Sequence, residues 1–454
     1  MARQAELGRL FEQDGDKVSY VTLSRKGRNT LARQGADVVC IQDVGDAAGR
    51  ERRVTVVDFA AMERLYGLVS LRDVYLADRA TPRKGEQQAA EDTVRFLWAW
   101  EHYFDTHPEI RCVIPDVGAE LVRRTAYFVC RRRGIRQMLW FVKPFPNSLL
   151  LLTDDFHARL VTKQEVWNTR PSERELMQAR RFLAAFEEDM RPFVPIRPPV
   201  LTIRRIGNFF RMLVDAIFLE RGYQEHLVPL RFLSSNVARW IKIRLFRWLL
   251  YRPLDLDRPF VLFPLHVTDD FKTSVMTPHC VHQDYFVQLC ADALPQGYTL
   301  AVKEHPSNVG GERLSMMFRL AKLPNIRIVA PETSTKWLII RSAAVAVLSS
   351  TTGLEALFLR KRVVTFGKPF YSGLGLTFDI DDVSGVRAVM REALDSGGPP
   401  EDALLTFVAL GMQRTFPGKP PMIDRSDENL RKVYGSLRRK VAELCEEEPI
   451  GRLG

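Results

Sequence analysis

Closely spaced cysteines are absent from this chain of 454 residues, which has six cysteines and no CxxC pair. Zinc sites and disulfide frameworks need cysteines at short, regular spacings, so we expect neither. The chain also lacks a signal segment and any apolar run of the roughly 18–20 residues that cross a bilayer. These absences predict a cytoplasmic protein without transmembrane helices. We expect its thiols to be reduced and buried: Cys40, Cys112, Cys130, Cys280, Cys290 and Cys445.

An excess of acidic residues is absent as well, because 66 Lys and Arg stand against 55 Asp and Glu, a net charge of +11. A positive protein attracts anionic partners, which include acidic lipids, nucleotides, anionic glycans and nucleic acid. The charge does not choose among them. A hydrophobic content of 46% is that of a globular protein, and the length predicts two domains rather than one.

Strand-like and helix-like segments alternate along the first half, which indicates an α/β domain with a mainly parallel sheet. We expect its strands over residues 17–24, 36–43, 53–59, 69–77, 110–116 and 138–143, and its helices over 90–106, 118–133 and 172–190. A second alternation has expected strands over 259–266, 298–304, 326–329, 343–348 and 362–366, and helices over 281–293, 311–322, 334–341 and 353–361. The predicted fold class is α/β, divided into an α/β domain 1–200, a helical connector 201–257, a second α/β domain 258–398 and a helical end 399–454.

Residues 201–252 differ in character, with ten Lys and Arg, three Asp and Glu, and interleaved Phe and Trp side chains. Such a segment suits an anionic membrane surface, where the aromatic rings enter the interface and the basic groups meet headgroups. A pair of packed helices with solvated basic faces is the alternative. Nucleic acid is not expected as a partner, because no binding motif accompanies the charge.

The run SSTTGLE at 349–355 follows an expected strand and opens an expected helix. Thr352 and Glu355 have the spacing of a capping box, which predicts a helix start near Gly353. Backbone N–H groups there, together with the hydroxyls of Ser349, Ser350 and Thr351, are placed to bind an anion at the positive end of the helix dipole. Simple helix capping is the alternative interpretation.

The run KEHP places His305 and Pro306 just after another expected strand. A histidine there is suited to donate a hydrogen bond to a phosphate or to protonate a leaving phosphate, because its pKa lies near neutrality. Pro306 restricts His305 to an extended conformation. Lys303 adds a positive charge to the same site, and Glu304 completes the run.

The run GKPFYSGLGLT at 367–377 is glycine-rich but has neither the dinucleotide-binding nor the P-loop spacing. Gly367 allows a ligand to approach the backbone, and an exposed Tyr371 is expected to stack on a base or sugar. An ordinary connection between a strand and a helix is the alternative.

Carboxylates at strand ends complete the candidates. His266, Asp269 and Asp270 follow the first strand of the second half and are expected to contact an acceptor or a sugar, although a solvated turn explains them equally well. Asp116 ends a strand of the first half and is the candidate catalytic base or nucleophile, with helix capping as its alternative. No metal site is expected, since neither DxD pair, at 255–257 or 379–381, ends a buried strand.

The order FPLH…KEHP…LSSTTGLEAL…KRVVTFGKPFYSGLGLT resembles the capsule polysaccharide biosynthesis family, which includes β-Kdo glycosyltransferases, over residues 258–385. The resemblance implies a GT-B fold, in which two Rossmann-like domains face each other across a cleft and the second domain holds a nucleotide-sugar without metal. It places these positions at the donor: His305, Pro306, Ser349, Ser350, Thr351, Gly353 and Glu355.

The resulting hypothesis is a glycosyltransferase at the inner face of the membrane that needs no cofactor. It moves a sugar, with CMP-Kdo as the leading donor, to a capsule or other surface polysaccharide or glycolipid acceptor. Expected partners are the nucleotide-sugar, the glycan acceptor, an anionic membrane surface through 201–252, and a polysaccharide export complex. Two alternatives remain open. One is a phosphotransferase that uses a CDP-polyol, and the other is a non-catalytic nucleotide- or glycan-binding partner of an export complex.

Overall fold

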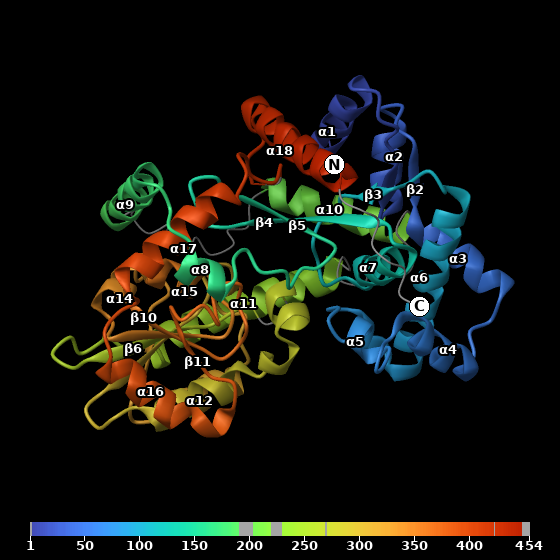
Figure 1. Ribbon diagram of the computed structural model, residues 1–454. Helices are drawn as coiled ribbons and strands as arrows, with labels where there is room; N and C mark the ends of the chain where they lie inside the picture. The colour runs from blue at the N-terminus through green and yellow to red at the C-terminus, as the bar shows by residue number, and fades with distance from the viewer. Residues whose placement is uncertain (1, 190–202, 219–228, 268–269, 422, 447–454) are drawn as a thin grey trace.

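The computed structural model describes residues 2–189, 203–218, 229–267, 270–421 and 423–446. The chain forms two α/β halves, each built around strands with helices packed on them (Figure 1). The predicted α/β class with helices at the carboxyl end is therefore confirmed.

The second half has one six-stranded parallel sheet, in the order β11-β10-β9-β6-β7-β8. Its strands are β6 (Phe260–Pro264), β7 (Thr299–Lys303), β8 (Ile326–Val329), β9 (Ala344–Val347), β10 (Arg362–Thr365) and β11 (Phe378–Asp379). Numbered in chain order from β6, these strands lie in the 3-2-1-4-5-6 order of the Rossmann fold. The strand order reverses between β6 and β9, and ligands of such sheets bind outside the carboxyl ends of the strands at that point.

Both faces of this sheet are buried, so its strands are nearly continuous apolar runs. Along β6, Val261 and Phe263 pack on one face while Phe260 and Leu262 pack on the other. The first face carries α12 (Gln283–Ala293), α13 (Leu314–Ala321) and α16 (Val386–Asp395). The opposite face carries α14 (Thr335–Arg341), α15 (Thr351–Phe358) and α17 (Glu401–Gln413).

The first half has two small sheets instead of one large one. Its strands are β1 (Tyr20–Thr22) and β2 (Val38–Cys40), which pair in parallel, and β3 (Cys112–Val113), β4 (Arg136–Val142) and β5 (Leu149–Thr153). The β3–β4 pair is parallel, whereas β4–β5 is antiparallel. The helices of this half are α1 (Ala2–Gln13), α2 (Arg25–Ala32), α3 (Ile41–Glu51), α4 (Val56–Tyr66), α5 (Arg72–Tyr75), α6 (Glu86–Thr106) and α7 (Leu121–Arg133).

Two expected strands of the first half are wrong. The segment 53–59 begins helix α4, because Thr55 and Asp58 form a capping box in which the Asp58 carboxylate accepts the Thr55 backbone N–H at 2.8 Å. The apolar Val56 and Val57 that suggested a strand are 75% and 77% exposed on this helix. The segment 69–77 contains helix α5 instead.

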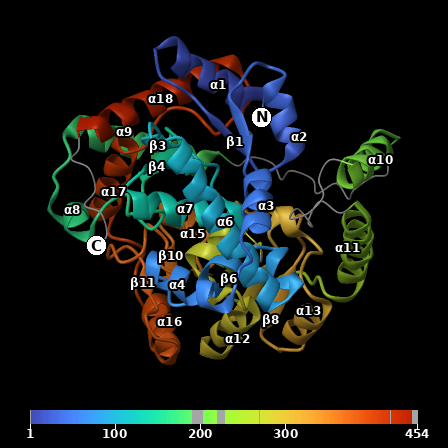
Figure 2. The ribbon, with the colours of Figure 1, turned by 90° about the vertical axis from the view of Figure 1, so that its right-hand side faces the viewer.

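The two halves share a core. Helices α8 (Lys163–Asn168) and α9 (Glu173–Glu188) of the first half pack against α17 of the second. The last helix, α18 (Asp427–Glu446), returns to the first half and packs against α1 (Figure 1). Helices α10 (Ile203–Phe218) and α11 (Pro229–Leu249) form a separate pair at the edge of the molecule (Figure 2). Buried thiols were expected. Cys40, Cys130, Cys280 and Cys290 are buried, whereas Cys112 is half-buried.

Candidate functional site

The turn between β9 and α15 lies at the point where the strand order reverses. Helix α15 begins at Thr351, and its N-cap is Ser350, whose hydroxyl accepts the Thr352 backbone N–H at 3.1 Å. The predicted start near Gly353, with Thr352 as the cap, is therefore wrong. Ser350 has the extended backbone of an N-cap residue, whereas Thr352 is already helical. The first N–H groups of the helix still open toward the carboxyl edge of the sheet, as predicted for an anion site.

His266 follows β6 and touches this turn. Its Nε2 accepts the Ser349 backbone N–H at 3.4 Å, so the proton of the neutral ring resides on Nδ1. The Gln283 side chain makes two hydrogen bonds to the His266 backbone. Its Oε1 accepts the His266 N–H at 2.6 Å, and its Nε2 donates to the His266 carbonyl at 3.1 Å. Burial, aided by the charge of Lys272, lowers the pKa of His266 to about 3. His266 is therefore a neutral support for the turn.

His305 lies on the loop after β7 and has the opposite tautomer. Its Nδ1 accepts the Ser307 backbone N–H at 3.2 Å, so the ring hydrogen is on Nε2. Loss of hydration and the nearby charge of Lys272 lower the pKa of His305. At neutral pH His305 is thus an uncharged donor through Nε2. Pro306 begins the short helix η5 (Pro306–Asn308) that positions the ring.

Lys303 and Glu304 are buried beneath this loop and have partners within the protein. Lys303 Nζ donates to the Pro331 carbonyl at 3.1 Å. Glu304 accepts the Tyr251 hydroxyl and the Gly310 backbone N–H, the latter at 3.0 Å. The structure therefore places both side chains as supports of the His305 loop rather than on its open side.

A charged cluster lies between the halves, with Lys272 at its centre. Lys272 begins the single π-helical turn η3 (Lys272–Met276). Its positive charge lowers the pKa of His266, His305 and Glu355 alike. Burial lowers the pKa of Lys272 itself, against the opposing effect of Asp270 and Glu355. Lys272 is thus within electrostatic reach of all three chain segments that form the carboxyl edge of the sheet.

Lys143 brings the first half into the cluster. It directly follows β4, is buried, and lies over the Phe370 ring with Nζ 4.4 Å from the ring centre. Burial and the like charge of Lys272 lower the pKa of Lys143 to about 7. No carboxylate of the described part of the chain forms an ion pair with it. Two lysines from opposite halves therefore lie near each other, and Lys143 has no carboxylate partner among the described residues, which favours binding of a negatively charged ligand.

Glu355 is the acidic member of the cluster. It is the fifth residue of α15, on the same helix as the turn that was predicted to bind an anion. Burial raises the pKa of Glu355 to about 7, against the opposing charges of Lys272 and Lys336. It does not act as the predicted capping partner, because the cap is Ser350. A carboxyl group with this pKa can accept or donate a hydrogen bond to a sugar hydroxyl near neutral pH.

The prediction of an exposed Tyr371 is wrong. Its ring is 1% exposed, and its hydroxyl donates to the Ser350 carbonyl beneath the turn. Tyr371 therefore braces the start of α15 and does not stack on a ligand. The following glycines, Gly373 and Gly375, have left-handed backbones with φ of 68° and 77°, which glycine adopts without strain. They allow close packing of Arg159 and Trp167 from the first half.

Gly367 lies where the chain leaving β10 crosses the end of β9. A Cβ atom there would lie 2.4 Å from the Leu348 carbonyl oxygen, and that backbone cannot move without moving the turn. We expect Gly367→Ala to lower the free energy of unfolding by about 1–3 kcal/mol, the usual cost of overpacking. Chemical denaturation measures this. Gly397→Ala is the control, because a Cβ there meets nothing within 4 Å. Equal stability of the two variants would contradict the close approach of Gly367 to the Leu348 carbonyl.

Asp116, Asp269 and Asp270 are the three aspartates that the sequence offered as candidates. Asp270 belongs to the cluster, since its charge raises the pKa of both His305 and Lys272. Asp269 lies outside the described residues. Asp116 lies beside α1, where Gln4 Nε2 donates to its carboxylate at 2.8 Å. The structure therefore gives Asp116 a contact with α1, and its catalytic role stays a prediction.

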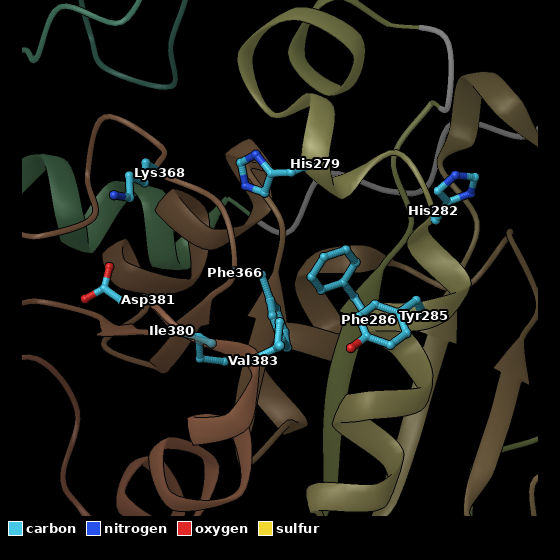
Figure 3. A pocket seen from close by; sticks show the side chains of 9 residues that line it. All are labelled: His279, His282, Tyr285, Phe286, Phe366, Lys368, Ile380, Asp381 and Val383. Atoms are coloured by element: carbon cyan, nitrogen blue, oxygen red, sulfur yellow. The ribbon is translucent and has the colours of Figure 1, made fainter.

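A pocket of about 580 Å³ lies between the start of α12 and the segment that follows β10 (Figure 3). Thr277 and Gly367 connect this pocket with the Ser349 turn, because the Thr277 and Ser349 hydroxyls are 3.4 Å apart and Gly367 donates its N–H to the Leu348 carbonyl at 2.8 Å. Aromatic rings and two charged groups line the pocket: His279, His282, Tyr285, Phe286, Phe366, Lys368 and Asp381, with Ile380 and Val383.

Lys143, Lys272 and the pocket are the parts that sequence reasoning missed. Sequence reasoning could have found Lys272, because it is a basic residue in the loop after the first strand of the second half. Lys143 had no signal in the sequence, because only the packing of the two halves brings it to the site. Within the described residues, no group of three or more His, Cys, Asp or Glu side chains is placed to hold a metal ion.

These features coincide with a known family. Residues 251–389, from the end of α11 into α16, match the family model described as capsule polysaccharide biosynthesis protein. Over these residues, which are less than half of its length, the chain is similar to the capsule polysaccharide biosynthesis family. The matched segment contains the turn, both histidines, Lys272 and the pocket, whereas Lys143 lies outside it.

Relatives match parts of the chain. Protein FixF of Sinorhizobium fredii is 29% identical over 157 residues, which are 34% of this chain and 37% of FixF. Capsule polysaccharide modification protein LipA of Neisseria meningitidis serogroup B is 27% identical over 124 residues, 27% of this chain and 18% of LipA. The alignments thus span well under half of either relative. Among solved structures, the beta Kdo 2,4 transferase of Thermosulfurimonas dismutans KpsC covers 72% of this chain and 86% of its own, with 15% identity and a TM-score of 0.38.

Proposed function

We propose that this protein is a glycosyltransferase that moves a sugar from a nucleotide-sugar to a surface polysaccharide or glycolipid acceptor. One observation carries the proposal. The neutral His305, the start of α15 and the charges of Lys272 and Lys143 converge at the carboxyl edge of a Rossmann-type sheet. Such an edge suits a phosphorylated ligand, and the family match places the segment in polysaccharide synthesis.

In this proposal the donor phosphate lies at the start of α15. Sugar transfer breaks the bond between the anomeric carbon and the phosphate oxygen, so negative charge grows on the departing phosphate. Helix N–H groups, His305 Nε2–H and Lys272 are preorganised to stabilise that charge, and donors of this kind contribute about 2.7–4 kcal/mol each. The base lies in the aromatic pocket, and Glu355 binds a hydroxyl of the donor.

CMP-Kdo remains the leading donor. It has one phosphate and a sugar carboxylate, so a second positive group beyond the phosphate site is useful. Lys143 and Lys272, from opposite halves, supply two such charges. We propose that binding needs no metal, because the lysines and the helix start provide the positive charge that a metal–diphosphate site would otherwise supply.

Thermal-shift measurements with CMP, CDP, UDP and GDP, with and without a chelator, test the donor class. A ligand at a hundred times its dissociation constant adds about 2.7 kcal/mol to apparent stability. Stabilisation by CMP that a chelator does not change supports the proposal. Stabilisation by CDP followed by incorporation of phosphorus into polymer would instead show the CDP-polyol phosphotransferase. Nucleotide binding without turnover of any acceptor would favour a non-catalytic partner.

We expect His305→Ala to leave the fold intact and to lower turnover at least tenfold, because the variant loses the Nε2–H donor to the departing phosphate. Release of CMP from a CMP-sugar measures turnover, and the thermal unfolding midpoint reports the fold. His102→Ala, on the exposed side of α6, is the matched control. Near-normal turnover of His305→Ala would remove this histidine from the mechanism.

A further inference from the structure

Helix α11 has an inner face that holds the His305 loop. Arg239 donates to the carbonyls of Ser307 and Val309, at 2.7 and 2.5 Å, and Lys242 donates to the Glu312 carbonyl at 2.9 Å. Ile243 packs against this loop at Gly310, and Phe246 enters the core of the second half. The inner face therefore fixes α11 to the site.

Among the described residues, the side chains on the outer face of α11 make no hydrogen bond to the His305 loop. Val237, Trp240, Ile241, Arg244 and Trp248 are spaced by three or four residues and lie on one side of the helix. All five are exposed, and Trp248 reaches 78%. The Arg244 guanidinium lies over the Trp240 ring at 3.9 Å from its centre. The face therefore combines apolar side chains with one cationic group, the Arg244 guanidinium, at the surface.

Helix α10 extends this surface. Its apolar side exposes Phe210, Val214 and Phe218, the last to 73%. The neighbouring Asp215 pairs with Lys26 of α2, a contact between α10 and the first half. We call the exposed side chains of α10 and α11 named here the aromatic face; Figure 2 shows both helices at the edge of the molecule.

The composition of the aromatic face selects its occupant. Arg244 is the charged member of this face, and the segment 201–252 that contains both helices has ten basic and three acidic residues, a balance that favours an anionic partner. Anionic lipid attracts such a segment at about 1 kcal/mol per Lys or Arg near the surface. Tryptophan and phenylalanine beside arginine are the side chains that enter the interface between headgroups and acyl chains. Within the described chain, no helix is long and apolar enough to cross a membrane, so contact through a face is the mode that these helices offer.

We propose that the aromatic face of α10 and α11 docks on an anionic lipid bilayer. The rings of Trp240, Trp248, Phe210 and Phe218 enter the interface, and Arg244 meets acidic headgroups. Because the inner face of α11 holds the His305 loop, docking places that loop about one helix diameter, roughly 10 Å, from the lipid surface. The proposal does not depend on the reaction catalysed, because it rests on side chains outside the site.

Vesicle flotation with the full-length protein tests the docking. We expect binding to vesicles of phosphatidylglycerol and phosphatidylcholine, little binding to phosphatidylcholine alone, and weaker binding as salt rises. The variant Trp240→Glu with Trp248→Glu is expected to bind at least tenfold more weakly, and Arg244→Glu several-fold more weakly. The controls on α4 are Val56→Glu with Val57→Glu, and Arg64→Glu, which also change exposed apolar and basic residues and are expected to bind like the wild type.

Four outcomes would overturn the proposal. They are no flotation of the wild type, equal binding to neutral vesicles, full binding by the double tryptophan variant, and equal loss in the α4 controls. Size-exclusion chromatography tests whether the aromatic face instead binds a second copy of the chain. If the wild type is a dimer and the tryptophan variant a monomer, while neither binds vesicles, the occupant is a second copy of the chain. The unfolding midpoint of each variant shows that it is folded, so that loss of binding reports the surface itself.

Discussion

Lys272→Met is expected to lower turnover about a hundredfold while the protein stays folded. Among the described residues, Lys272 is the positive group whose charge acts on His266, His305 and Glu355 together. Removal of a preorganised electrostatic group at the reacting centre typically costs 10²–10³ in kcat. Steady-state release of CMP from a CMP-sugar measures the effect. Methionine retains most of the side-chain volume, so packing around η3 is preserved.

A second measurement on this variant does not require a known substrate. The charge of Lys272 lowers the pKa of His305, so its removal is expected to raise that pKa. Nuclear magnetic resonance of the histidine ring reports the titration. Lys361→Met is the matched control, because Lys361 is also partly buried but lies at the amino end of β10, away from the cluster. An unchanged His305 titration, or turnover equal to the control, would show that Lys272 does not act on the site.

Lys143→Met is expected to make the protein more stable at pH 7, by about 2–4 kcal/mol. The pKa of Lys143 is about 7 in the folded protein, compared with 10.5 ordinarily. Between these values the unfolded chain binds a proton that the folded protein does not, so wild-type stability rises with pH through this window. Below pH 7 the full penalty is present, and above pH 10.5 it is absent. A difference of one in pKa corresponds to about 1.4 kcal/mol.

Urea denaturation from pH 7 to 10 measures this effect. The stability difference between Lys143→Met and the wild type is expected to shrink toward zero as pH rises. The exposed Lys163→Met, on α8, is the control and is expected to behave like the wild type throughout. If the proposed function is right, Lys143→Met also binds CMP-sugar more weakly, because it lacks a charge that faces the donor. A stability difference that does not vary with pH would contradict the low pKa.

The second half was predictable because burial on both faces makes its strands into plain apolar runs. Strands expected at 326–329 and 343–348 appear as Ile326–Val329 and Ala344–Val347. The first half was less predictable, because its strands are short and their apolar patterns are weak. Helix-capping residues can then outweigh strand propensity in the same segment. At Thr55 a capping box overrode a run of β-branched residues, and the antiparallel β5 was not expected.

The sequence alone determined the fold class of this protein and the place of its candidate site. Apolar periodicity, together with the hydroxyls at 349–352 and the histidine after β7, was enough, because strand ends of a parallel sheet meet at one edge. Tertiary structure decided which side chains face that edge. It buried Tyr371 and Glu304 as supports, and it brought Lys143 from the first half beside Lys272. Such proximity depends on how the two halves pack, and no spacing along a chain encodes the distance between residues 129 positions apart.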